Sequence, residues 1–167
     1  MEGFGMKIII SRHGEAEDIS PTGKDIDRPL SGQGRQEILK MASFIKRGNL
    51  HVRHIYHSPY LRTRQTAEIY AEELGLREVV ETCDELAPGN ECMDLLQKIR
   101  HFSNSDTFLL VSHNPGVSHF AARLIQDDGL AGSLLFATGT ALALNIAREK
   151  FCKAQIIWMI SPQDLTL

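Results

Sequence analysis

The pattern of apolar and polar positions predicts strands that alternate with helices along most of the chain. Residues 6–11 include three consecutive isoleucines, which are apolar and β-branched, and this pattern is typical of a strand buried on both faces. Later apolar runs are also short and rich in β-branched residues. They predict strands at residues 53–57, 107–112, 140–146 and 154–160, and a weaker one at Val79-Val80.

Helical spacing of apolar residues, together with start and stop signals, predicts helices between these strands. Ile38, Ala42 and Ile45, for example, fall on one face of a helix. Pro59 and Pro115 stand where helices can begin, because the N–H that proline lacks is not needed in the first turn. The predicted helices are residues 33–46, 61–74, 93–102 and 115 to about 126, and residues 129–132 are expected to form a loop.

Alternating strands and helices that end in a pair of strands indicate an α/β fold. We expect a three-layer α/β/α sandwich with a mostly parallel mixed sheet and an antiparallel edge at the C-terminal end. The last two strands are expected to be joined around residues 148–150 and to pair antiparallel. No internal repeat or linker divides the chain, so residues 1–167 are predicted to form a single domain.

Composition and charge narrow the class of protein. Apolar residues make up 43% of the 167 positions and charged residues 23%, as in ordinary globular domains. The net charge of −3 argues against a nucleic-acid binder, which usually carries a basic excess. The apolar runs are far shorter than the ~20 residues that span a bilayer, and the N-terminal residues do not resemble a signal peptide. We therefore expect a cytoplasmic protein that binds neither nucleic acid nor a membrane.

Polar clusters stand at the ends of three predicted strands. Arg12 and His13 follow the first strand, residues 58–62 (SPYLR) follow the second, and residues 112–115 (SHNP) end the strand at 107–112. Because ligands of open α/β sheets bind beyond the carboxyl ends of the strands, parallel strands would bring these clusters to one crevice. Guanidinium groups and helix N-termini bind phosphate oxygens, and an imidazole can attack phosphorus. The clusters predict a phosphoryl-binding site with a histidine nucleophile.

Each cluster taken alone also has an ordinary structural explanation. An Arg-His-Gly tripeptide occurs often by chance. Arg62 and Arg64 would suit a solvated helix face, on which Arg64 and Glu68 form an i,i+4 pair. Residues 112–115 would suit a turn that starts a helix. The convergence of all three clusters on strand ends is what favours a functional site.

The remaining histidines and the cysteines give no sign of a metal site. His51, His54 and His57 are spaced by three, but they cross a predicted strand, where successive side chains face opposite sides. We expect them at the surface or in loops. Cys83 and Cys92 are expected to be small packing residues with reduced thiols. The sequence thus predicts neither a metal nor a cofactor.

Four motifs resemble, in order, those of the histidine phosphatase superfamily, also called the phosphoglycerate mutase-like family. They are residues 12–14 (RHG), 28–34 (RPLSGQG), 58–67 (SPYLRTRQTA) and 112–115 (SHNP). Within the superfamily, the chain most resembles the small bacterial phosphohistidine phosphatases of the signal-inhibitory type. That resemblance includes residues 84–89 (DELAPG) and 158–165 (WMISPQDL) and spans nearly the whole chain.

The resemblance implies a role for each residue of the predicted site. His13 would be the nucleophile that becomes transiently phosphorylated. Arg12 and Arg62 would hold the phosphoryl oxygens, and His113 would bind the same group and stabilise the transition state. These are the residues that the strand-end argument also singles out. Arginine and histidine would carry the positive charge that Mg²⁺ supplies in kinases, so no metal is implied.

The general acid is less clearly marked. Many relatives place a carboxylic acid after the middle strand to protonate the leaving oxygen. Here Asp84 and Glu85 are both candidates, and Glu85 could equally cap or orient its own loop. The sequence leaves these alternatives open.

The implied function is that of a metal-independent phosphohistidine phosphatase in signal transduction, acting on a phosphotransfer protein. A phosphatase of a small phosphorylated metabolite is the alternative within the superfamily, although the chain has no room for a large specificity insertion. A third hypothesis, from another class, is a module that binds phosphorylated partners without catalysis. The presence of both His13 and Arg62 argues against it.

Overall fold

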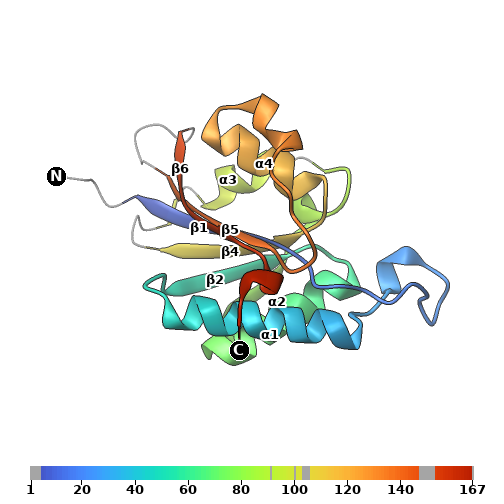
Figure 1. Ribbon diagram of the computed structural model, residues 1–167. Coiled ribbons are helices and arrows are strands. Elements are labelled where there is room, and N and C mark those ends of the chain that lie inside the picture. Colours follow the sequence, from blue (N-terminus) through green and yellow to red (C-terminus); the bar gives the residue numbers. More distant parts are fainter. Residues whose placement is uncertain (1–4, 91, 100, 103–105, 147–152, 167) are drawn as a thin grey trace.

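One mixed sheet forms the centre of the molecule in the computed structural model (Figure 1). The structure describes residues 5–90, 92–99, 101–102, 106–146 and 153–166. Within them, the strand order is β3-β2-β4-β1-β5-β6. The strands are β1 (Met6–Arg12), β2 (Val52–His57), β3 (Val80–Thr82), β4 (Thr107–Ser112), β5 (Ala141–Ile146) and β6 (Ala154–Ile160).

The sheet is parallel on one side and antiparallel on the other, as predicted. β3, β2, β4 and β1 run parallel, whereas β5 is antiparallel to β1 and β6 is antiparallel to β5. The connection expected around residues 148–150 lies outside the described residues. Because β1 is central and both of its faces are covered, its three isoleucines are all buried.

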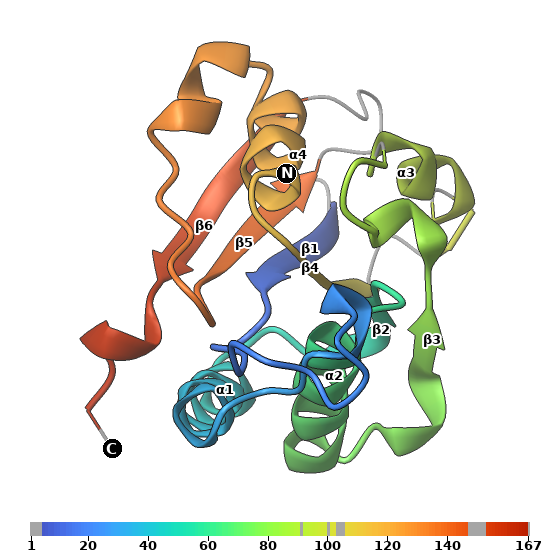
Figure 2. The ribbon, with the colours of Figure 1, turned by 90° about the vertical axis from the view of Figure 1, so that its right-hand side faces the viewer.

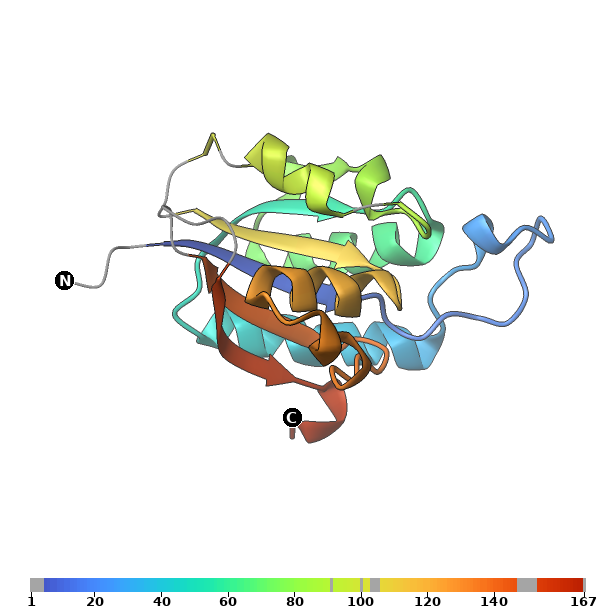
Figure 3. The same cartoon turned by 90° about the horizontal axis from the view of Figure 1, so that it is seen from above.

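Helices cover both faces of the sheet, which confirms the predicted three layers (Figures 1 and 3). Helices α1 (Gly32–Arg47) and α2 (Leu61–Leu74) lie on one face, and α3 (Met93–Ile99) and α4 (Gly116–Ile125) lie on the other. Ile9 packs into the core on the side of α1 and α2, while Ile8 and Ile10 pack into the core on the side of α3 and α4. Alternate residues of one strand therefore serve two separate cores.

Local signals explain where helices begin and end. The Ser31 hydroxyl accepts a hydrogen bond from the Gly34 N–H and so caps α1. Helix α2 ends at Gly75, whose φ of 72° is left-handed and therefore favours glycine. Both ends agree with the sequence prediction to within one residue.

Four local predictions differ from the structure. The weak strand predicted at Val79-Val80 is β3 (Val80–Thr82), and Val79 ends a 3₁₀ helix, η2 (Arg77–Val79). Helix α3 ends at Ile99, short of the predicted end at residue 102. The loop expected at residues 129–132 is part of a 3₁₀ helix, η4 (Asp128–Gly132). His57, expected at the surface or in a loop, is buried: its Nδ1–H donates to the Ser58 carbonyl oxygen at 2.7 Å. A buried imidazole needs such a partner, and periodicity alone does not reveal one.

A long excursion between β1 and α1 projects from the carboxyl edge of the parallel strands (Figure 2, blue). It spans residues 13–31 and includes the short 3₁₀ helix η1 (Asp25–Asp27). A bridge between Ala16 and Leu30 closes its base. The excursion therefore stands beside the ends of β1, β2 and β4, where the predicted site residues lie.

Candidate active site

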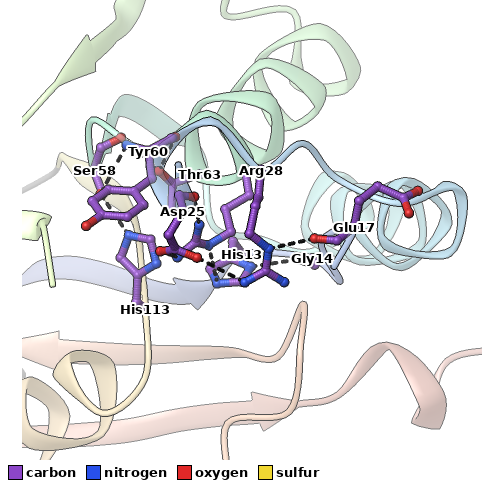
Figure 4. A network of polar contacts seen from close by, with 10 residues as sticks. His13, Gly14, Glu17, Asp25, Arg28, Ser58, Tyr60, Thr63 and His113 are labelled. Carbon is purple, nitrogen blue, oxygen red and sulfur yellow. Dashed lines mark hydrogen bonds and ion pairs between the residues drawn. The ribbon is translucent and has the colours of Figure 1, made fainter. Parts of the chain in front are cut away.

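The ends of β1 and β4 and the start of α2 bring the predicted site residues together, and Figure 4 shows His13 and His113 among their neighbours. The ring centroids of His13 and His113 are 5.1 Å apart. The Nε of Arg62 lies 3.2 Å from the Nε2 of His13. Arg12, the last residue of β1, is close enough to lower the pKa of both histidines. Residues from three distant parts of the sequence thus form one cluster, in which Arg12 and Arg62 carry the positive charge.

Glycines allow the first two motifs to pack against each other. A Cβ on Gly14 would lie 2.5 Å from the carbonyl oxygen of Gly34, closer than real Cβ contacts. The Gly14 N–H donates to the Thr66 hydroxyl, which in turn donates to the Arg62 carbonyl oxygen. This close approach of backbone to backbone holds His13 over the first turn of α2.

The backbone determines which nitrogen of His13 is free. Its Nδ1 lies 2.7 Å from the carbonyl oxygen of Gly14. A carbonyl oxygen can only accept, so Nδ1 carries the proton and Nε2 keeps its lone pair. The Nε–H of Arg62 donates to that lone pair. His13 therefore presents a nucleophilic nitrogen directly against a guanidinium group.

The environment keeps His13 neutral. Its pKa is lowered to about 4, mainly by burial and also by the positive charges of Arg62, Arg12 and Arg28, while the Gly14 carbonyl opposes the shift. Protonation would place a further positive charge beside these arginines in a buried site. At neutral pH the imidazole is therefore in the form that can attack an electrophile.

His113 is also neutral and is oriented by a serine. Burial lowers its pKa to about 3, and His13 and Arg62 contribute to the same shift. Its Nε2 lies 2.8 Å from the Ser58 hydroxyl oxygen, and its ring packs edge-on against Tyr60. When the Ser58 hydroxyl donates to Nε2, the remaining N–H of the ring is on Nδ1.

Two buried polar atoms of the cluster have no hydrogen-bond partner within the described part of the chain. They are Nε of Arg12 and Nδ1 of His113. The other end of the Arg12 guanidinium donates from Nη1 to the Phe136 carbonyl oxygen at 2.8 Å, which holds the side chain in place. Buried donors without partners are costly, and an anion with several oxygens would satisfy them. The cluster can therefore bind an oxyanion such as a phosphoryl group.

Glu85, the candidate general acid, contacts Cys83 and Lys98. Its carboxylate accepts a hydrogen bond from the Cys83 thiol at 2.9 Å and forms an ion pair with Lys98. The Cys83 hydrogen bond and the Lys98 contact lower its pKa to about 2, so it is ionised at neutral pH and has no proton to donate. No hydrogen bond or ion pair within the described residues joins Glu85 to His13 or His113. The side chain of Asp84, the other candidate, is exposed. The structure thus favours the alternative that Glu85 orients its own loop.

Sequence reasoning missed three residues that support the cluster. Ser58, which orients His113, was visible within the third motif but was not given a role. Glu37 is buried on the apolar face of α1, accepts from the Glu15 N–H at 2.9 Å and acts electrostatically on Arg12. The sequence did contain a signal for Glu37, because it is a carboxylate on the face of the helix that is predicted to be apolar. Asp25, which contacts Arg62, stands in a polar loop and had no signal.

Other parts of the molecule contain neither a metal site nor a membrane helix, as far as the structure describes them. Within the described ranges, no group of three or more His, Cys, Asp or Glu side chains could hold a metal ion. None of the helices in those ranges is long and apolar enough to cross a membrane. Cys83 and Cys92 are buried, as predicted for packing residues.

Comparison with known proteins identifies the family. Residues 8–90 match the family model of the histidine phosphatase superfamily, branch 1. This chain belongs to the histidine phosphatase superfamily, so the resemblance of its motifs and the prediction of a phosphatase are confirmed.

Particular relatives agree over nearly the full length. The chain is 26% identical over 164 residues to the phosphohistidine phosphatase SixA of Escherichia coli (strain K12), which covers 97% of this chain and 98% of SixA. The solved structure of the protein histidine phosphatase SixA complexed with tungstate superposes with a TM-score of 0.83 at 25% identity, covering 95% of this chain and 99% of the other. An uncharacterised protein of Picosynechococcus sp. is 34% identical over 119 residues, which are 70% of this chain and 71% of that protein.

Proposed function

We propose that this protein is a phosphohistidine phosphatase and that His13 becomes transiently phosphorylated during the reaction. The observation that carries the proposal is the neutral His13 imidazole, whose Nε2 lone pair faces the Arg62 guanidinium at 3.2 Å. The similarity to SixA, a phosphohistidine phosphatase, supports the choice of substrate. The tungstate complex of SixA supports an oxyanion site in this fold, because tungstate is an oxyanion like phosphate.

In the first step, the Arg62 Nε–H passes from His13 Nε2 to a phosphoryl oxygen, and the freed Nε2 lone pair forms a bond to phosphorus while the bond from phosphorus to the leaving group of the substrate breaks. Arg12, Arg62 and the Nδ1–H of His113 hold the phosphoryl oxygens and stabilise the charge in the transition state. The proton stays on Nδ1 of His13 and remains hydrogen-bonded to the Gly14 carbonyl oxygen. The phosphorylated ring therefore carries a positive charge. No metal is needed, because the guanidinium groups supply the positive charge.

In the second step, a water molecule attacks the phosphorus of phosphorylated His13. The P–N bond breaks, its electron pair returns to Nε2, and the proton lost by water goes to the phosphate that leaves. His13 is then neutral again with its proton still on Nδ1, as in the resting structure. Atoms and charge therefore balance over the two steps, and the products are inorganic phosphate and the dephosphorylated substrate.

The leaving group decides which substrate suits this site. A phosphohistidine that is protonated on its other ring nitrogen expels neutral imidazole and needs no proton from the enzyme. An alkyl phosphate expels a basic alkoxide unless a positioned acid protonates it. General-acid catalysis of this kind raises the reaction rate by about 10²–10⁴-fold. Glu85 has a pKa of about 2 and lies in contact with Lys98, so it cannot supply that proton. This supports phosphohistidine over alkyl phosphates as the substrate.

Exposed apolar side chains on two of the segments that contribute to the site support a protein rather than a metabolite as the partner. Ile19 and Leu135 are each 81% exposed. Ile19 belongs to the excursion at residues 13–31, and Leu135 precedes Phe136, whose carbonyl oxygen binds Arg12. Such side chains would contact the surface of a phosphorylated protein. We take the whole chain, residues 1–167, to be one catalytic domain acting in the cytoplasm, with no role in nucleic-acid binding.

The test compares substrates and traps the intermediate. We expect kcat/KM for a phosphohistidine peptide to exceed that for a phosphoserine peptide and for sugar phosphates by about 10²–10⁴-fold. Rapid quench with labelled substrate should trap an acid-labile phosphoenzyme in the parent and none in His13→Ala. Equal kcat/KM for phosphoserine and phosphohistidine peptides would contradict the proposal, and a preference for sugar phosphates would favour the metabolite phosphatase.

A further inference from the structure

The excursion places a carboxylate on the arginine that faces the nucleophile (Figure 4). Asp25 Oδ2 accepts from Nη2 of Arg62 at 3.0 Å, and the Asp25 backbone oxygen accepts from Nη1 of the same guanidinium at 2.8 Å. The second carboxylate oxygen, Oδ1, accepts from Nη1 of Arg28 at 3.0 Å. One carboxylate therefore bridges two arginines directly beside His13.

The Asp25 carboxylate lies against the edge of the Arg62 guanidinium that would bind a phosphoryl group. Nε and Nη2 lie along one edge of the guanidinium, and their N–H groups form a fork that matches two oxygens. In the structure, Nε donates to His13 Nε2 and Nη2 donates to Asp25 Oδ2. A phosphoryl group bound to that fork would take the Nε–H from His13 Nε2, which leaves that lone pair free, and at Nη2 it would need the position of the Asp25 oxygen. Carboxylate and phosphoryl oxygens are thus alternative partners of the same donors.

The burial of the two partners indicates which of them can move away. The Arg62 side chain is only 8% exposed and its guanidinium stacks over the Tyr60 ring at 4.7 Å, whereas the Asp25 side chain is 57% exposed. Partial burial raises the pKa of Asp25, but hydrogen bonds from Arg28 and Arg62 outweigh this and lower it, so the group is an anion at neutral pH. After leaving Arg62, the carboxylate can keep its contact with Arg28.

We propose that Asp25 is an internal competitor of the phosphoryl group: its carboxylate occupies the Nη2 prong of the Arg62 fork in the resting enzyme and must be displaced by substrate. This inference rests on the proposed function, since it assigns Arg62 to the phosphoryl group. Its consequence is that Asp25 weakens the binding of inorganic phosphate, the product, and so speeds its release. Asp25 thereby determines how tightly the site holds a phosphoryl group.

If Asp25 instead served to position Arg62, its removal would change the Kd for anions in the opposite direction. If the carboxylate were needed to hold Arg62 in place, its removal would weaken the binding of anions. The test measures the Kd of inorganic phosphate and of tungstate by calorimetry for the parent, Asp25→Asn and Asp25→Ala. We expect Kd to fall about tenfold in both variants, because a charge-assisted hydrogen bond no longer competes. An unchanged or raised Kd would overturn the proposal.

A matched control separates local competition from the change in net charge. Asp27 lies in the same 3₁₀ helix and accepts from the Thr22 hydroxyl at 2.5 Å. Asp27→Asn removes the same charge and should leave the Kd of phosphate within about twofold of the parent. An equal fall of Kd in Asp27→Asn would also overturn the proposal, since it would show a general charge effect. Thermal melts check that each variant is folded.

The outcome is distinguishable from failure of the proposed function. Anion binding is measured without turnover and can be repeated in His13→Ala. If Asp25→Asn tightens phosphate binding but the parent does not hydrolyse phosphohistidine, the competitor role stands and the proposed substrate is wrong. If the parent hydrolyses phosphohistidine but Asp25→Asn does not bind phosphate more tightly, only the role of Asp25 is wrong.

Discussion

The hydroxyl oxygen of Ser58 lies 2.8 Å from Nε2 of His113, and both groups are buried. The two residues are 55 positions apart and come from the ends of β2 and β4. The Ser58 N–H donates to the Val111 carbonyl oxygen, so the serine is also held by the neighbouring strand. This contact turns the Nδ1 atom of His113 away from Ser58, toward a position where the described residues offer it no partner.

Ser58→Ala should lower kcat on a phosphohistidine peptide by roughly 3- to 10-fold, the value of one neutral hydrogen bond of about 0.5–1.5 kcal/mol. The loss arises because the His113 ring is no longer held in one orientation or tautomer. Steady-state kinetics of the variant measure the effect. Ser133→Ala, at an exposed position, is the control and should match the parent. A Ser58→Ala enzyme with parental kcat would show that His113 needs no orientation by Ser58.

Arg62→Lys should lower kcat/KM by roughly ten- to a hundredfold, because an ammonium group cannot reproduce the two-pronged contact worth about 1.5–3 kcal/mol. The measurement is kcat/KM on the phosphohistidine peptide. Arg64→Lys tests the same change on the exposed side of α2, where Arg64 pairs with Glu68 at 3.6 Å, and it should be neutral. Activity of Arg62→Lys within twofold of the parent would mean that no bidentate contact to Arg62 is required.

The tautomer and the pKa of His13 can be observed directly by NMR titration of its ring nitrogens. We expect a neutral ring with its proton on Nδ1 from pH 7 down to about pH 5, since burial and the nearby arginines lower the pKa to about 4. In the unfolded chain the ring titrates near 6.5. A midpoint near 6.5 in the folded protein would contradict the environment described for this residue.

The lowered pKa of His13 also predicts how the stability of the folded protein changes with pH. Between about pH 6.5 and 4 the unfolded chain binds a proton at His13 that the folded protein does not bind, so stability falls as the pH is lowered through this window. Each such histidine contributes at most about 1.4 kcal/mol per pH unit. Denaturant melts between pH 7 and 4 measure the slope, and His13→Ala should make it smaller.

Glu85→Gln should leave kcat/KM within about twofold of the parent on both phosphohistidine and alkyl phosphates, because the ionised carboxylate donates no proton. It should lower the melting temperature, since the ion pair with Lys98 is lost. The difference in stability between the variant and the parent should disappear as the pH falls from about 4.5 to 2, because the parent carboxyl then becomes protonated and loses its charge too. A large loss on alkyl phosphates alone would restore Glu85 as a general acid. Asp84→Asn serves as the paired variant.

Leu135→Ser should lower kcat/KM on a phosphorylated protein by several-fold and leave hydrolysis of free phosphohistidine unchanged, because only the protein reaches the exposed apolar side chain. Comparing the two substrates in one variant measures the difference. Ile156→Ser is the control, since Ile156 is 49% exposed on β6, a strand at the edge of the sheet. Equal effects on both substrates would argue against a protein surface contact at Leu135.

Much of the fold was predictable because its signals are local. Three isoleucines in succession indicated β1, which lies at the centre of the sheet. Helix α2 begins and ends at the predicted residues, since Gly75 takes the left-handed conformation that stops it. Where periodicity was short or weak, the boundaries moved: α3 is Met93–Ile99, and residues 101 and 102, which were predicted to be helical, are not. In that segment, local pattern is a poor guide to where packing stops.

The sequence alone determined the order of strands and helices and the positions of Arg12, His13, Arg62 and His113 at strand ends and helix starts, because these depend on neighbours only a few residues away. Tertiary structure decided what those side chains touch. Asp25 contacts Arg62 from 37 positions away, and Glu85 contacts Cys83 and Lys98. Such contacts depend on how a long excursion and separate helices pack on the sheet. No local pattern of apolar and polar residues encodes that packing, since a charged side chain in a loop has the same sequence signature whether it faces water or an arginine.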